Sequence, residues 1–175
     1  KLISRQSVNC EKEIVDIRPD GSFHLNQAYF NYQVGLEMIS DRFSSLFGKP
    51  PRKKHEKLES FHQDIAASIQ KVIEKAMLTA ALELYRRTGE ENLCMAGGLT
   101  LNCVANGRVL RETPFRNVWI QPAAGDAGGA LGAALAVWHR YLGESRLPLE
   151  GRDQQKGSLL GTSYTDQEIK QFLRE

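Results

Sequence analysis

The longest regular spacing of apolar residues in the chain lies between residues 58 and 84. Apolar side chains recur there every three or four residues: Leu58, Phe61, Ile65, Ile69, Val72, Ala76, Ala80 and Leu84. This period is that of one face of a long helix, so we expect a helix whose apolar stripe lies in the core. Arg86 and Arg87 suit the negative end of the helix dipole, and Gly89 can adopt the left-handed conformation that ends a helix.

Shorter segments precede this helix. Residues 13–25 place a Pro-Asp-Gly turn between two short apolar runs, which is typical of a β-hairpin. Residues 26–48 are rich in aromatic side chains and have mixed periodicity. Pro50 and Pro51 lack amide donors and interrupt any helix there. The sequence therefore predicts a hairpin and an irregular region that a loop separates from the long helix.

Two segments of the same kind follow the long helix. The first covers residues 92–111 and turns at Gly97 and Gly98, and the second covers residues 118–141 and turns at the glycine-rich stretch 123–130. Each reads as strand, glycine turn and helix. Two such segments predict an α/β fold whose ligand lies beyond the carboxyl ends of the strands.

Composition limits the classes of function. A chain of 175 residues is long enough for one domain with its own core. The balance of 23 Lys and Arg against 21 Asp and Glu gives a net charge of +2, which favours neither nucleic acid nor membrane as a partner. Three unpaired cysteines indicate the reduced thiols of a cytoplasmic protein. The chain begins at Lys1 without Met or a leader pattern, so we expect a fragment of a longer protein.

The first glycine turn is a candidate phosphate site. Gly97 and Gly98 let the backbone approach a ligand, and amides at the following helix start would point toward it. The alternative is a tight turn without a ligand. Asn102 can donate to and accept from a nucleotide, or it can satisfy backbone groups at the helix start.

The second glycine turn carries a lone carboxylate. Asp126 lies between Gly125 on one side and Gly128 and Gly129 on the other. It can cap the following helix or ligate a divalent cation beside bound phosphates. A second glycine turn close by in the sequence favours the metal, because a nucleotide and its cation need backbone donors and an oxygen ligand together.

Three ordered blocks, residues 64–74, 93–110 and 121–135, resemble the nodulation-type O-carbamoyltransferases. In looser form they resemble hydrogenase-maturation carbamoyltransferases and threonylcarbamoyladenosine transferases of the actin-like ATPase superfamily. The resemblance implies the second half of an actin-like (ribonuclease H-like) ATPase domain, with a mixed sheet flanked by helices. It places that half-domain in residues 1–142, and residues 143–175 form a linker and the start of a C-terminal region.

The resemblance also implies chemistry. Such enzymes carry a carbamoyl group from carbamoyl phosphate, through a carbamoyl-adenylate made with ATP, to a hydroxyl of a sugar or other metabolite. The resemblance implies that the rest of the polypeptide is a partner of this chain, and it is compatible with a homodimer. Nucleotide binding would fall to one set of residues: Gly97, Gly98, Asn102, Gly125, Gly128 and Gly129. Asp126 would be both catalytic and the ligand of a metal such as iron, zinc or magnesium.

One family feature is missing. The family's two metal-binding histidines are spaced H-x-x-x-H, whereas His55 and His62 are seven residues apart, so we interpret them as solvated or partner-facing. Cys94 and Cys103 flank the first glycine turn, and we assign them to packing. Two other functions stay open: an actin-like nucleotide-binding module for switching or assembly, and a regulatory or solute-binding fragment with a degenerate site.

Overall fold

The computed structural model describes residues 10–147, 155–158 and 161–174. The chain forms two compact units. The first comprises Lys1–Cys94 and Asn102–Trp119, and the second comprises Met95–Leu101 and Ile120–Glu175. The predicted boundary between residues 142 and 143 stays a prediction, and the expected linker lies partly outside the described residues.

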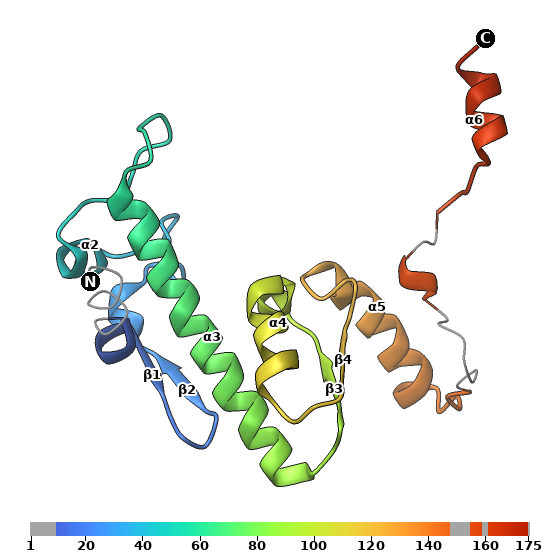
Figure 1. Ribbon diagram of the computed structural model, residues 1–175, viewed down its shortest axis with the longest axis horizontal. Helices are drawn as coiled ribbons and strands as arrows, with labels where there is room; N and C mark the ends of the chain where they lie inside the picture. The colour runs from blue at the N-terminus through green and yellow to red at the C-terminus, as the bar shows by residue number, and fades with distance from the viewer. Residues whose placement is uncertain (1–9, 148–154, 159–160, 175) are drawn as a thin grey trace. The chain divides into compact units, whose positions relative to one another are not determined.

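The first unit opens with the expected hairpin (Figure 1). After the helical turn η1 (Cys10–Ile14), β1 (Val15–Ile17) pairs antiparallel with β2 (Phe23–Leu25). Gly21 in the turn has a φ of 81°, and a Cβ there would lie 3.1 Å from the Cα of Ala80. Glycine therefore suits the turn twice, by its backbone conformation and by its close approach to the long helix.

The irregular region contains short elements that periodicity did not predict. They are η2 (Gln27–Tyr29), a bridge between Phe30 and Ile39, and α2 (Asp41–Phe47). Aromatic rings hold this region together: the rings of Phe43 and Phe47 lie 4.8 Å apart, centre to centre. These side chains cover a small core of Cys10, Ile14 and Val72.

The long helix α3 (Ser60–Thr88) is confirmed, and it ends where predicted. Gly89 is left-handed with a φ of 67°, and its amide donates to the carbonyl of Tyr85. The predicted buried stripe is wrong in part. Its members Leu58, Ile69 and Leu84 are 67%, 36% and 44% exposed. The buried residues of α3 are Ser68, Val72, Glu74, Met77 and Ala81.

The packing of α3 explains this difference. The helix contacts η1 along one part and α4 (Cys103–Glu112) along another, so two neighbours bury different faces. Figure 1 shows the hairpin and α4 on opposite sides of α3. Other buried residues lie on α4 or follow α3 and α4 in the chain: Leu93, Ala105, Val109 and Phe115. A single periodic stripe of apolar residues predicts one buried face, whereas α3 has two.

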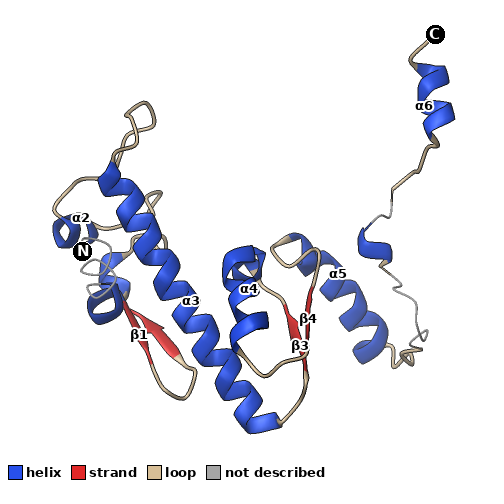
Figure 2. Cartoon of the chain, in the orientation of Figure 1, coloured by secondary structure: helices blue, strands red, loops and turns tan. Residues whose placement is uncertain are grey.

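The predicted strands are β3 (Asn92–Met95) and β4 (Asn117–Ile120), and they pair with each other (Figure 2). The amide of Asn117 donates to the carbonyl of Glu91, and the amide of Gln121 donates to that of Met95. Residue numbers rise together along the pair, so the strands are parallel. The described residues thus form a mixed α/β structure with two two-stranded sheets, in place of the one mixed sheet expected.

The second unit continues with helices. It contains the short turn η3 (Gly98–Leu101), then α5 (Ala127–Ala136), which runs into η4 (Val137–Tyr141). The predicted apolar helix at residues 131–141 is confirmed, with its start earlier than expected. Farther along the chain lie η5 (Lys156–Ser158) and α6 (Asp166–Phe172). Thr165 and Glu168 form a capping box at the start of α6.

Candidate functional site

The two glycine turns meet at the carboxyl ends of β3 and β4. The amide of Gly97 donates to the carbonyl of Ala124 over 2.8 Å. A Cβ on Gly125 would lie 3.7 Å from Cδ1 of Leu101, so the second turn also lies beside the end of the first. Both turns therefore lie at the carboxyl end of the strand pair, where the sequence predicts the ligand of such a fold. One ligand could therefore contact both turns.

The first turn exposes backbone. Gly97 has a φ of 103°, a conformation that side chains disfavour. Its carbonyl accepts from both the amide and the hydroxyl of Thr100, whose side chain is buried and holds the turn closed. A Cβ on Gly98 would meet no atom of the described residues within 4 Å. The space beside the Gly98 backbone is thus open to a ligand.

The second turn presents Asp126. Two backbone hydrogen bonds fold the turn: the amide of Gly128 donates to the carbonyl of Gly125, and the amide of Gly129 donates to that of Asp126. Asp126 occupies the N-cap position of α5, yet its side chain makes no capping bond and is exposed. Of the two roles considered for this carboxylate, the capping one has no support in its geometry. The carboxylate is available to a cation.

The glycines of this second turn serve different ends. A Cβ on Gly128 would lie 2.2 Å from the carbonyl oxygen of Ala123, a distance that no side chain tolerates. A Cβ on Gly129 would have no neighbour within 4 Å in the part of the chain that the structure describes. Gly128 is therefore required by the turn itself, whereas Gly129 leaves backbone open to solvent.

Asn102 belongs to the first unit, where it caps α4. Its Oδ1 accepts from the amide of Ala105 over 3.1 Å. The same carboxamide pairs with Gln70 of α3 in both directions: Gln70 Nε2 donates to Asn102 Oδ1 over 3.1 Å, and Asn102 Nδ2 donates to Gln70 Oε1 over 2.8 Å. The local role considered for Asn102 is present, and one hydrogen of its Nδ2 is not used by these bonds.

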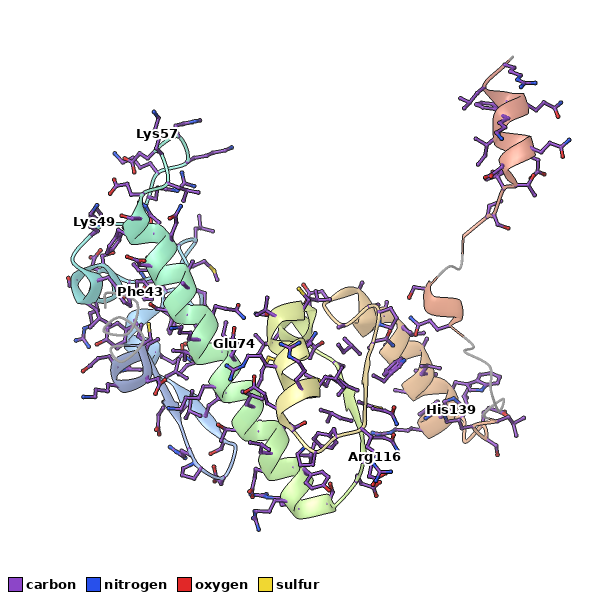
Figure 3. The ribbon with its side chains drawn as sticks, viewed as in Figure 1. Phe43, Lys49, Lys57, Glu74, Arg116 and His139 are labelled. Carbon is purple, nitrogen blue, oxygen red and sulfur yellow. The ribbon has the colours of Figure 1, made fainter. Side chains whose placement is uncertain are left out.

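A charged pair extends this contact. Gln70 Nε2 also donates to Glu74, and Arg108 of α4 donates to the other oxygen of Glu74 over 2.8 Å. Figure 3 shows Glu74 on the side of α3 that faces α4. The bonds from Gln70 and then from Arg108 hold the pKa of the Glu74 carboxyl below its ordinary value. Gln70 and Glu74 were not singled out from the sequence, although both fall in the block at residues 64–74.

Two histidines, His62 and His139, have local partners. Nδ1 of His62 accepts from the amide of Glu59 in a capping box at the start of α3, and Nδ1 of His139 lies 2.8 Å from the carbonyl of Glu144. Within the described residues no group of three His, Cys, Asp or Glu side chains is placed to hold a metal ion. This part of the chain therefore offers Asp126 alone at the glycine turns.

The cysteines correct one expectation. Cys94 and Cys103 are exposed, so they do not pack inside the described structure as expected. The chain turns at Gly97 and Gly98 between them and leaves both on the surface. Cys10 is the buried one, and burial raises its pKa to about 11, which keeps the thiol protonated and unreactive.

Comparison with known proteins decides the family. Residues 2–135 match the family described as "Carbamoyltransferase N-terminus". The chain belongs to this carbamoyltransferase family. The two glycine turns and Asn102 all lie inside the matched region, so the geometry described above is that of a carbamoyltransferase N-terminal region.

Relatives of this carbamoyltransferase chain agree with the resemblance to nodulation proteins. The uncharacterized protein sll1178 of Synechocystis is 53% identical over 161 residues, which are 92% of this chain and 26% of that protein. Nodulation protein NolO of Bradyrhizobium diazoefficiens is 41% identical over 61% of this chain and 19% of its own length. Nodulation protein U of the same organism is 31% identical over 59% and 18%. The chain thus spans about a quarter or less of these relatives.

None of the described helices of this carbamoyltransferase chain has the length and apolar character needed to cross a membrane.

Proposed function

We propose that this chain is the nucleotide- and metal-binding part of an ATP-dependent O-carbamoyltransferase. It would work within a longer polypeptide, called the full-length protein below, that is cytoplasmic and has an actin-like ATPase fold. The donor would be carbamoyl phosphate, used through a carbamoyl-adenylate, and the acceptor would be a hydroxyl of a sugar or other metabolite. The observation that carries the proposal is the hydrogen bond from Gly97 to Ala124, which joins the two glycine turns at one end of a parallel strand pair.

The turns suit a phosphate-bearing ligand. Open space at Gly98 and Gly129 leaves no side chain in the path of phosphate oxygens, and at Gly98 it lets them approach the backbone closely. Asn102 follows Leu101 directly in the chain and adds a side-chain amide to the proposed nucleotide contacts. These residues bind and orient the nucleotide.

Asp126 would hold the cation. Its carboxylate is exposed and not engaged in capping, and an oxygen ligand suits a divalent ion beside phosphates. Such an ion supplies positive charge against the charge that develops on oxygens during transfer. Its other ligands would come from outside the described residues of this chain.

The experiment measures ATP-analogue affinity of the full-length protein with Gly98→Val. Gly98 lies in open space at an ordinary φ, so valine should leave the fold intact while its branches obstruct the ligand. We expect affinity to fall by about tenfold or more, in proportion to the lost backbone contacts. Gly161→Val, at another position where a Cβ meets no described atom within 4 Å, is the control. Equal affinity in both variants would refute the phosphate site. Nucleotide binding without carbamoyl transfer to any acceptor would favour a switching module instead.

A further inference from the structure

The contact between Asn102 and Gln70 fixes more than the position of Asn102. A carboxamide has a donor end and an acceptor end, and the hydrogen-bond network determines which end points where. Here the network has groups of known polarity at both ends. The amide of Ala105 can only donate, and the carboxylate of Glu74 can only accept.

The group at each end of the network determines which atom of the neighbouring carboxamide is the oxygen and which is the nitrogen. Since the Ala105 amide donates, the atom of Asn102 beside it must be Oδ1. Since Glu74 is held ionised by Arg108, the atom of Gln70 beside it must be Nε2. Both constraints give the same pairing between the two carboxamides. If both carboxamides were rotated by half a turn, Asn102 Nδ2 would face the donating amide of Ala105, and Gln70 Oε1 would face the accepting carboxylate of Glu74.

The burial of the network strengthens this constraint. The side chain of Glu74 is 11% exposed, so few water molecules could compensate a misplaced polar atom. On Asn102, Oδ1 already accepts two hydrogen bonds, while Nδ2 has used one of its two hydrogens. The remaining bonding capacity of Asn102 is therefore a donor.

We infer that Gln70, anchored by Glu74, is a positioning residue that makes Asn102 meet the nucleotide as a hydrogen-bond donor, so that the matching ligand atom is an acceptor such as a phosphate oxygen or a ring nitrogen. This inference rests on the proposed function. It assigns a role to the block at residues 64–74, far from the glycine turns in the sequence. Asn102 touches the ligand, and Gln70 acts through it.

The test measures ATP-analogue affinity and unfolding temperature of the full-length protein for two single variants and their combination. Asn102→Asp keeps the oxygen that caps α4 but removes the donor, and Gln70→Met keeps the length of the side chain but removes its hydrogen bonds. Each should weaken binding by about tenfold, the effect of a hydrogen bond to a charged group. Glu112→Gln is the control, because it removes the exposed ion pair between Glu112 and Arg108 and leaves Gln70 and Asn102 unchanged. This variant should bind like the parent.

The combined variant separates positioning from plain structural damage. If Gln70 acts through Asn102, the double variant binds no more weakly than the weaker single variant, whereas independent damage would multiply the two losses. Inorganic tripolyphosphate as a competitor distinguishes the acceptor: a contact with phosphate weakens its binding in parallel, and a contact with the base leaves it unchanged. Full affinity in Asn102→Asp, or multiplied losses, would overturn the inference alone. Failure of the parent protein to bind nucleotide would overturn the proposed function as well.

Discussion

Gly128 and Gly129 are adjacent in the chain, yet they differ sharply in what surrounds them. Alanine normally stabilises a helix relative to glycine by about 1 kcal/mol. We expect this gain for Gly129→Ala, where a Cβ meets nothing. Gly128→Ala should instead lose about 1–3 kcal/mol, because its Cβ would overlap the carbonyl oxygen of Ala123 and the turn would have to shift. Urea unfolding of both variants checks this. A similar stability for the two would contradict the described turn.

Asp126 permits a test of function without loss of fold. Its side chain caps nothing and is exposed, so Asp126→Ala in the full-length protein should leave the unfolding temperature unchanged. Carbamoyl transfer should fall by on the order of 10²-fold if the carboxylate holds the cation. Glu144→Gln removes another exposed carboxylate as a control. Unchanged turnover of Asp126→Ala would exclude the metal assignment.

At the scale of the element, the end of α3 carries a pH-sensitive cluster. Glu83 accepts hydrogen bonds from Arg86 and then from Arg87, and they lower its pKa from 4.5 to about 2. A lowered carboxyl pKa stabilises the fold above the unfolded value, and this contribution is lost as pH falls from about 4.5 to about 2. We therefore expect Glu83→Gln to flatten the loss of stability across that window, measured by urea unfolding. Glu90→Gln, an exposed position past the helix end, should keep the parent's slope.

The elements also show what the sequence could predict. Local signals sufficed for the end of α3 at Gly89, for the hairpin turn and for both strand-turn-helix segments, because glycine conformation and apolar period act over a few residues. The pairing of Gln70 with Asn102 spans 32 residues and depends on how α3 packs on α4, which no local pattern encodes. The burial of Glu74, which accepts from Arg108 of α4, follows from the same packing. The shared end of the glycine turns was predictable because parallel strands place their carboxyl ends together.

For the whole molecule, the family is shown by comparison, whereas the activity is a proposal. The match over residues 2–135 places the chain among the carbamoyltransferases. The chain spans 26% of sll1178, so the activity of a full-length protein belongs to the proposal. Gly97, Gly98 and Asp126 are all exposed in the described structure. A nucleotide bound there would remain in contact with water, which weakens every polar interaction it makes.

We therefore predict that this 175-residue chain by itself neither retains metal nor transfers a carbamoyl group. A catalytic cation needs about three protein ligands beside its open positions, and the described residues hold no such group. Asp126 alone is too weak a ligand. The chain is dialysed with metal, then mixed with ATP, carbamoyl phosphate and a panel of hydroxylated acceptors. Metal content and carbamoylated product are measured by mass spectrometry beside the full-length protein. Stoichiometric metal together with turnover in the short chain would show that its own residues complete the site.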